Sequence, residues 1–529
     1  MSSPQLASLI PFLPTYGHLI FASLVPIFAG SHASLRRPFN TLSPEELKIL
    51  RPKGDTSTEE EDDENDNEAS TPVPETLTAQ DAMLFPVMAG VCLGGLYLII
   101  KWLDDPQLLS RILTWYFCAM GIFGVGKAFS DLLSVAVEYA LPHRFTDSNG
   151  KLHEAGFDSW KVEGSDQEPT NPIPNIELPP FLHKYVWTAR RALRARYLVD
   201  ISMFNVNVLR KSNAFIGEFV GPVIGLFVVG AYAAGGKHWL LTNIMGISFS
   251  YGAVQLLSPA TFPIATLLLG LLFFYDIFFV FYTPLMVTVA TTLDVPIKLL
   301  FPRPGKLADG SRALAMLGLG DIVLPGIFIA MALRYDLWRF YEIKHRMLIK
   351  AARADKGELS KEEIKYLKPR YTRVSFWDCA SIGAFPKTYF NASMVGYVVG
   401  MVTTLVVMHV FKHAQPALLY LVPGVLSAVW GTAAAKGELK TMWNYTEEGE
   451  IEDEEKKDEE KDEKKDEKKE EEIKVKGEVD QDILRVKIIR RPAIGARLLP
   501  EPSSTPPAVD DEEGALSEDC DNSVYSISD

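Results

Sequence analysis

The segment LLLGLLFFYDIFFVFYTPLMVTVA at residues 267–290 carries a single charged residue, Asp276, in the middle of a long apolar run. A helix of about 20 mainly apolar residues is long enough to cross the hydrocarbon core of a bilayer. An ionised carboxyl group is costly at that depth, so an aspartate found there is by default a candidate functional residue. The segment predicts a membrane-spanning helix with a reactive carboxyl group inside the bilayer.

A second carboxyl group of this kind is Asp321, in AMLGLGDIVLPGIFIAMALR at residues 315–334. When two neighbouring aspartates share one proton, one of them can act as a base and the other as an acid. The base would activate a water molecule that attacks a peptide carbonyl, and the acid would protonate the oxyanion and then the leaving amine. We predict Asp276 and Asp321 as the catalytic pair of an aspartic protease, which needs no metal and no cofactor.

The rest of the chain predicts an all-α polytopic membrane fold with nine spanning helices. Apolar residues make up 47% of the 529 residues and charged residues 23%, and the two classes occupy separate blocks. Segments that can span a bilayer lie at about residues 8–30, 83–102, 108–136, 213–234, 239–257, 262–288, 313–334, 388–410 and 415–435. The first segment follows no basic residues and is longer than the apolar part of a secretory signal, so we interpret it as a span.

The distribution of charge predicts an orientation and argues against a nucleic-acid partner. The net charge of −14 comes largely from acidic stretches at 55–68 and 447–472, which belong to a linker and a tail. Lys and Arg collect in the loops after the first, third and seventh spans, and cytoplasmic loops are enriched in these residues. We therefore expect a lumenal N-terminus and a cytosolic C-terminus, although the loop at 289–312, on the opposite side, is also basic.

These features divide the chain into six regions. They are an N-terminal three-helix membrane region at 1–136 with an acidic cytosolic linker at 31–82, a cytosolic loop insertion at 137–212, a membrane core at 213–334, a basic cytosolic loop at 335–387, the last two helices at 388–436, and an acidic, largely disordered cytosolic tail at 437–529. Within the tail, residues 473–499 alternate partly between apolar and polar types, which is compatible with a strand-like docking segment.

Residues beside the two aspartates are candidates for supporting the site. Gly318, Leu319 and Gly320 come directly before Asp321, and the glycines would leave the backbone uncovered and conformationally free for an extended substrate. Close packing of helices is the alternative explanation of these glycines. Tyr275 could hydrogen-bond to the catalytic pair, or it could pack at a helix interface.

The last predicted span opens with Gln415, Pro416, Ala417 and Leu418. A proline in a helix removes a backbone hydrogen bond, so this helix is expected to be kinked or poorly hydrogen-bonded at this point. A proline that opens a helix is also a favourable first residue with no further role. These four residues are therefore candidates for substrate binding or active-site support, with the structural explanation left open.

Three strings together resemble the YD, GxGD and PAL motifs of the signal peptide peptidase family, in the same order and spacing. They are FFYDIFFVF at 273–281, MLGLGDIVLPGIFIA at 316–330 and KHAQPALLYLVP at 412–423. The resemblance runs from the second predicted span to the ninth. It implies a nine-span fold related to presenilin, catalytic roles for Asp276 and Asp321, and a cytosolic C-terminus. The loop charges and the form of the last motif favour the peptidase branch over presenilin.

The resemblance also implies a protease of the endoplasmic reticulum membrane that cleaves signal-peptide remnants and type II membrane segments within the bilayer. Transmembrane peptides and the lipid bilayer are the expected partners, and the family is compatible with a homo-oligomer and with partners in protein quality control. A proton-coupled transporter and a catalytically silent scaffold that binds membrane helices are the alternatives. The absence of similar halves argues against the transporter, and the two intact aspartates argue against the scaffold.

Overall fold

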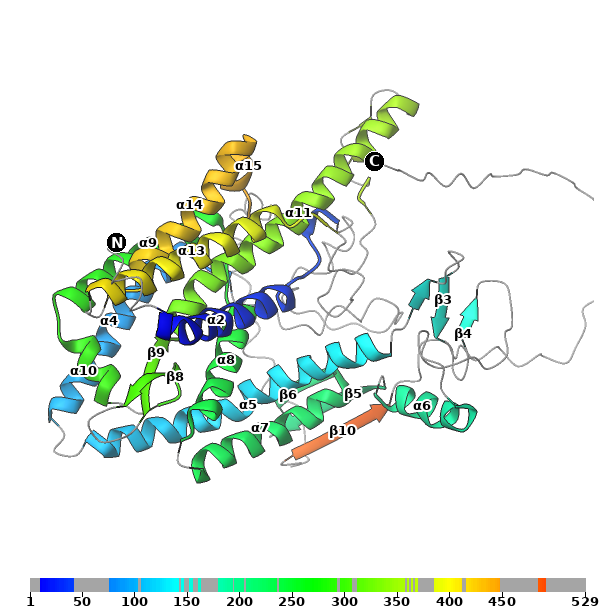
Figure 1. Cartoon of the computed structure of the whole chain (residues 1–529). Helices are drawn as coiled ribbons and strands as arrows, with labels where there is room; N and C mark the ends of the chain where they lie inside the picture. Colours follow the sequence, from blue (N-terminus) through cyan, green and yellow to red (C-terminus); the bar gives the residue numbers. More distant parts are fainter. Residues whose placement is uncertain are drawn as a thin grey trace, which may run out of the picture. The chain divides into compact units, whose positions relative to one another are not determined.

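The structure is a computed structural model in which helices predominate (Figure 1). It describes residues 10–41, 76–102, 106–141, 237–292, 295–306, 312–356, 385–411, 415–447 and 484–490, most of 179–235, and short stretches at 144–146, 152–155, 160–162 and between 359 and 369. The helices are α2 Leu13–Ala33, α4 Ala79–Trp102, α5 Pro106–Ala140, α6 Pro180–Leu193, α7 Ile216–Ala234, α8 Trp239–Leu256, α9 Phe262–Phe281, α10 Leu285–Thr292, α11 Gly320–Lys356, α13 Thr388–Phe411, α14 Leu418–Lys436 and α15 Leu439–Trp443.

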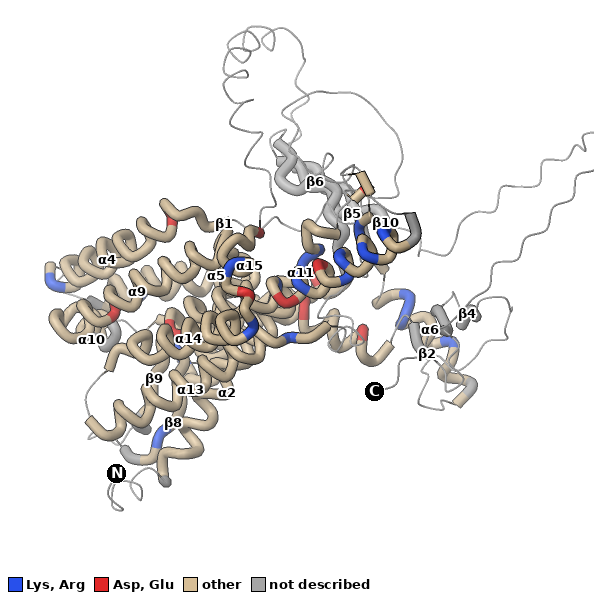
Figure 2. The backbone as a smooth tube through the Cα atoms, turned by 90° about the horizontal axis from the view of Figure 1, so that it is seen from above, with Lys and Arg blue, Asp and Glu red and all other residues tan. Residues whose placement is uncertain are grey.

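Among the described helices, seven are long and apolar enough to cross a membrane: α2, α4, α5, α7, α9, α13 and α14. Large apolar side chains also point outward from them, as Val223, Leu226 and Phe227 do on α7. Figure 2 shows α4 and α9 as almost uncharged helices with isolated acidic residues. These features confirm a polytopic helical membrane fold. The other two of the nine predicted spans correspond to α8 and α11, so the total of nine stays a prediction.

Two predicted spans differ from the helices that form. The span predicted at 262–288 is split, because α9 ends at Phe281 and Pro284, which lacks an N–H, lies just before α10. The span predicted at 313–334 is wrong at its start, and the helix that follows is longer than predicted. Its first residues form a strand, and α11 then continues to Lys356 through residues placed in the basic loop at 335–387. The helix persists because 335–356 contains neither glycine nor proline.

Short strands connect segments that are far apart in the sequence. β1 (Thr76–Leu77) pairs in parallel with β7 (Ser258–Pro259), and β8 (Lys298–Lys306) forms an antiparallel hairpin with β9 (Arg312–Gly318). A third sheet consists of β2 (Arg144–Thr146), β3 (Leu152–Ala155) and β4 (Trp160–Val162). A fourth sheet has the strand order β10-β5-β6, with β10 at Leu484–Arg490, β5 at Arg196–Met203 and β6 at Val206–Phe215. The strand-like segment predicted at 473–499 therefore contains a strand.

Small residues bring two pairs of helices into backbone contact. A Cβ atom on Gly396 of α13 would lie 2.5 Å from the Gly424 carbonyl oxygen of α14, and one on Gly221 of α7 would lie 2.2 Å from the Gly126 oxygen of α5. Helices in a bilayer associate largely through such close van der Waals packing, because lipid offers no hydrophobic driving force between them. The α13–α14 pair matters for the site, since α14 opens with the Pro416 segment.

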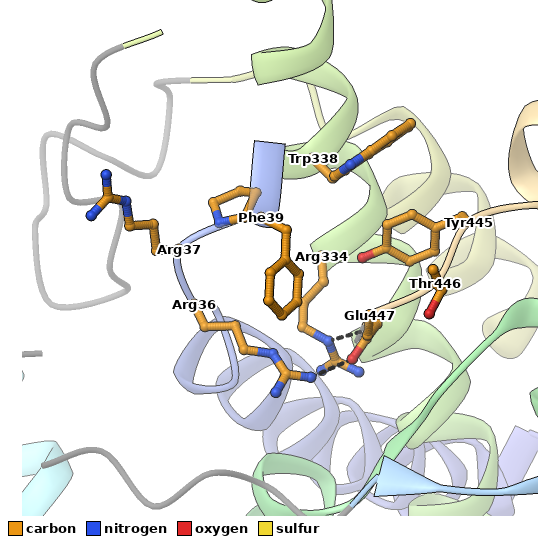
Figure 3. Close-up of a pocket in the computed structure, with 9 residues that line it drawn as sticks. Arg36, Arg37, Phe39, Arg334, Trp338, Tyr445, Thr446 and Glu447 are labelled. Atoms are coloured by element: carbon orange, nitrogen blue, oxygen red, sulfur yellow. Dashed lines mark hydrogen bonds and ion pairs between the residues drawn. The ribbon is translucent and has the colours of Figure 1, made fainter. Parts of the chain in front are cut away.

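A polar cluster, which we call the clasp, joins four segments of the chain, and Figure 3 shows three of its members, Arg36, Arg334 and Glu447. It consists of Ser34, Arg36, Ser258, Arg334 and Glu447. Arg334 Nε donates to Glu447 Oε1 at 2.7 Å and its other nitrogens donate to Ser34 and Ser258, while Arg36 and Ser258 also donate to Glu447. Glu447 is 5% exposed and Arg334 is 4% exposed. The clasp therefore fixes the segment after α15 to α2, α11 and the turn between α8 and α9.

Candidate active site

Asp276 lies on the buried face of α9, where its carboxyl group meets the first residue of α14. The side chain is 4% exposed, and Oδ2 accepts the backbone N–H of Leu418 at 3.1 Å. Leu418 begins α14, so its N–H has no partner within the helix, and the helix terminus favours a negative charge nearby. The structure thus brings together two residues that the sequence placed in one site from different motifs.

Asp321 lies in the first turn of α11, one residue after the helix begins at Gly320. Its side chain is partly buried, and the start of a helix favours a carboxylate there as well. The carboxyl groups of Asp321 and Asp276 are close enough to interact electrostatically. The structure thus places the two aspartates near each other, and their role as a catalytic pair stays a prediction.

The packing of α9 against α11 explains why the two carboxyl groups lie at one depth. The rings of Phe262 and Tyr335 are in edge-to-face contact, with centroids 5.4 Å apart. Asp276 comes 14 residues after Phe262, and Asp321 comes 14 residues before Tyr335. Since the two helices run in opposite directions and rise 1.5 Å per residue, both aspartates lie about 21 Å from that contact. Asp276, near the end of α9, and Asp321, in the first turn of α11, therefore lie at about the same distance along the helices from this contact.

The residues before Asp321 leave an open backbone, as expected. Gly318 and Gly320 are exposed, a Cβ on Gly320 would meet no atom within 4 Å, and one on Gly318 would lie 3.5 Å from Asp321 Oδ2. Neither glycine has a positive φ, so their conformational freedom is not used in this structure. Leu319 is partly buried and its N–H donates to the Ile297 carbonyl at 3.3 Å. The open space, rather than helix packing, distinguishes the two glycines.

The four predicted supporting residues at 415–418 differ in burial and in hydrogen bonding. Gln415 precedes the helix and is partly buried, Pro416 is buried, and the Ala417 carbonyl accepts the N–H groups of Tyr420 and Leu421 as α14 begins. Only Leu418 of this motif makes a hydrogen bond to an aspartate among the described residues.

Tyr275 packs at the interface of α9 and α4. Its ring lies 4.4 Å from that of Phe279, centroid to centroid, and a Cβ on Gly90 of α4 would be 3.7 Å from the Tyr275 ring. This contact favours the packing explanation of Tyr275 over a hydrogen bond to the aspartates.

Two features of the site were not predicted. The β8–β9 hairpin leads directly into Gly318, although the sequence placed most of β9 inside a helix. Tyr397 of α13 is fully buried and its hydroxyl lies 3.4 Å from the backbone oxygen of Asp321. The only sequence signal for Tyr397 was its place between Gly396 and Gly400, which are small residues at the spacing of a helix contact.

The geometry, a buried carboxyl group near the end of α9 and a second one in the first turn of α11, can be compared with known families. A sequence profile of the family described as signal peptide peptidase matches residues 69–449. This chain belongs to the signal peptide peptidase family. The matched residues contain both aspartates and every described transmembrane helix except α2, and they end two residues after Glu447 of the clasp.

Individual relatives agree with the family profile. A protein of Mus musculus named signal peptide peptidase is 30% identical over 439 residues, which cover 82% of this chain and 83% of the relative. Its Homo sapiens counterpart is 29% identical over the same length, and intramembrane protease 2 of Caenorhabditis elegans is 40% identical over 222 residues, or 41% of each chain. No solved structure matches the chain. The chain is therefore a multi-pass membrane protein and an intramembrane aspartic protease.

Proposed function

We propose that Asp276 and Asp321 are the catalytic pair with which this protease hydrolyses signal-peptide remnants and type II membrane segments inside the bilayer. The observation that carries the proposal is the pairing of Asp276 and Asp321 at one depth of two antiparallel helices. A shared proton reduces the charge that the pair must hold in a medium of low dielectric constant. It also supplies the acid and the base that peptide hydrolysis requires.

The surroundings suggest how the two roles are divided. Asp276 accepts the Leu418 N–H at 3.1 Å, and a hydrogen bond to a carboxylate favours its charged form. In this scheme Asp276 is the base that takes a proton from the attacking water molecule. Asp321 is the acid that donates a proton to the oxyanion and then to the leaving amine.

The β8–β9 hairpin offers a place where an extended substrate can bind. One edge of β8 is already occupied, because the Asn243 side chain both donates to and accepts from the Leu300 backbone, at 2.8 and 2.7 Å. Pro302, two residues on, has no N–H, and Thr15 donates to its carbonyl at 2.9 Å. A substrate strand cannot pair with this edge of β8.

The pairing register of β8 and β9 also determines which backbone groups of β9 point outward from the hairpin. Leu300 faces Met316, and since Leu300 directs its backbone groups away from β9, Met316 directs its own away from β8. The same alternation applies to Gly318, which faces Lys298. Met316 is 53% exposed. We infer that a substrate pairs with the backbone of Met316 and Gly318 and thereby reaches Asp321 three residues further on.

Removal of one backbone donor tests this edge. Met316→Pro deletes the N–H that we expect to pair with substrate, and proline is tolerated on the open side of an edge strand. We expect kcat/KM to fall about tenfold, which corresponds to one lost hydrogen bond. Met316→Ala keeps the N–H and should behave as the wild type. Equal activities of Met316→Pro and wild type would show that substrate does not pair here.

The location and orientation of the chain are part of the same proposal. Two members of the clasp mark where predicted spans meet basic loops: Ser34 follows the first span and Arg334 ends the seventh. Cytoplasmic loops are enriched in Lys and Arg. We therefore assign the clasp to the cytosolic face of the endoplasmic reticulum membrane and the N-terminus to the lumen. Protease protection of tags at the two termini in sealed microsomes tests this assignment, with the C-terminal tag digested and the N-terminal tag protected.

The activity itself is tested with purified protein in detergent and a labelled signal peptide. Cleavage by wild type supports the proposed function. A well-folded wild-type protein that binds such peptides and leaves a panel of them intact would instead support the scaffold, and one that moves protons across liposome membranes without cleavage would support the transporter.

A further inference from the structure

α11 contains a proline one turn after Asp321. Pro325 lies inside this helix and has no N–H, and the group that would normally receive a bond from residue 325 is the backbone carbonyl four residues earlier. That carbonyl belongs to Asp321. Asp321 therefore carries a proposed catalytic carboxyl group, and its backbone carbonyl lacks the regular hydrogen-bond donor within α11.

A side chain from another helix lies at this carbonyl. The Tyr397 hydroxyl of α13 is 3.4 Å from the Asp321 oxygen, and the tyrosine is 0% exposed. An unpartnered carbonyl in an apolar interior is unfavourable, and a hydroxyl group can replace the missing N–H. Ser23 of α2 is the other polar neighbour of this phenol, and it donates its own proton to the Ile20 carbonyl at 2.8 Å.

The helix that carries Tyr397 is held rigidly. Gly396 and Gly400 on either side of it contact the backbone of α14, where added Cβ atoms would lie 2.5 Å from the Gly424 oxygen and 2.8 Å from the Tyr420 oxygen. On α11, a Cβ on Gly326 would lie 2.8 Å from Val254 of α8. α13 and α11 are each packed closely against a neighbouring helix, and Asp336 of α11 joins the two by accepting the backbone N–H groups of Tyr389 and Phe390 of α13.

We propose that Tyr397 is a positioning residue for Asp321, its phenol donating the hydrogen bond that Pro325 cannot. This bond fixes the first turn of α11 and, with it, the direction of the Asp321 carboxyl group toward Asp276. The inference rests on the proposed catalytic role of Asp321. Pro325 has a role as well, because without an N–H at residue 325 the Asp321 carbonyl can accept a hydrogen bond from outside the helix.

The test is a pair of substitutions in the full-length protein. Tyr397→Phe keeps the ring and removes the donor, and kcat should fall about tenfold with KM unchanged, as expected for the loss of one hydrogen bond. Pro325→Ala restores the backbone N–H to α11. In the Pro325→Ala background, Tyr397→Phe should change kcat less than about threefold, since the helix then satisfies the carbonyl itself. Ser23→Ala, which removes the other neighbour of the phenol, should leave kcat near that of the wild type.

The outcomes separate this proposal from the proposed function. If Asp321→Asn retains activity, the catalytic assignment fails whatever Tyr397 does. If Asp321→Asn is inactive and Tyr397→Phe has the wild-type kcat, or loses as much kcat with Pro325→Ala as without it, the positioning role is wrong. Should the Pro325→Ala proteins not fold, the contrast of Tyr397→Phe with Ser23→Ala decides, because equal kcat values for these two contradict the proposal.

Discussion

Asp276→Asn and Asp321→Asn are each expected to lower kcat for cleavage of a signal peptide by about 1,000-fold or more, because each removes a general acid or base. Asparagine has nearly the same shape as aspartate but cannot exchange a proton. KM should change little, since neither carboxyl group lies on the proposed β9 binding edge. Steady-state initial rates over a range of substrate concentrations, with purified proteins in detergent, measure both constants.

The matched control for this pair is Asp81→Asn. Asp81 is an exposed carboxyl group in the first turn of α4, where it accepts hydrogen bonds from Thr78. It lies far along the chain from either motif, and its loss should leave kcat unchanged. A double variant, Asp276→Asn with Asp321→Asn, should be no less active than either single variant, because the two residues act as a unit. Additive losses would argue for separate roles.

Glu447→Ala is expected to lower the free energy of unfolding by about 3–5 kcal/mol, the range for breaking a buried ion pair and leaving its partners uncompensated. Arg334, which is 4% exposed, would lose its only carboxylate partner in the clasp, and Arg36 would lose its carboxylate partner and keep only the Ser258 hydroxyl there. Thermal unfolding in detergent measures the change. The control is Glu342→Ala, whose partner Arg346 has a side chain 69% exposed, and there the loss should be about 1 kcal/mol or less.

The same cluster predicts how stability depends on pH. Burial alone would raise the pKa of the Glu447 carboxyl group, but Arg334, Arg36 and the Ser258 hydroxyl lower it below its ordinary value. A carboxyl group with a lowered folded-state pKa stabilises the fold at pH values above its ordinary pKa of about 4.5, and this contribution is lost as the pH falls through the lower value. Wild type should therefore lose stability below about pH 4.5 more steeply than Glu447→Ala. Parallel pH profiles would contradict the ionised state of Glu447.

The two candidate aspartates can be selected from the sequence because ionisable residues are rare inside a bilayer. Asp276 and Asp321 stand out in apolar runs, since an ionisable residue in such a run has few structural explanations. Nothing in the sequence indicated that the Leu418 N–H donates to Asp276. The two residues are far apart in the chain, and the contact depends on how α14 packs against α9. The motif resemblance implied that Leu418 belongs to the site, and the structure shows that its backbone N–H is the group that contacts Asp276.

The parts that could not be predicted depend on contacts between distant segments. β9 is rich in Ala, Leu and Met, which favour a helix, and it becomes a strand because it pairs with β8 and because Gly318 and Gly320 weaken a helix at that point. The clasp is built by two polar residues after α2 and by one each from β7, α11 and the segment after α15, and none of these forms a motif by itself. Tyr397 was overlooked for the same reason, since its partner is a carbonyl that becomes available only through Pro325.

The most direct test of the account is to locate the bond that the protein cuts. A labelled signal peptide is incubated with wild type and with the Asp276→Asn and Asp321→Asn variants in H₂¹⁸O, and the fragments are analysed by mass spectrometry. The account predicts a new C-terminus inside the apolar segment, carrying one ¹⁸O atom from the attacking water, with wild type only. Cleavage outside the apolar segment, or the same fragments from either variant, would contradict it.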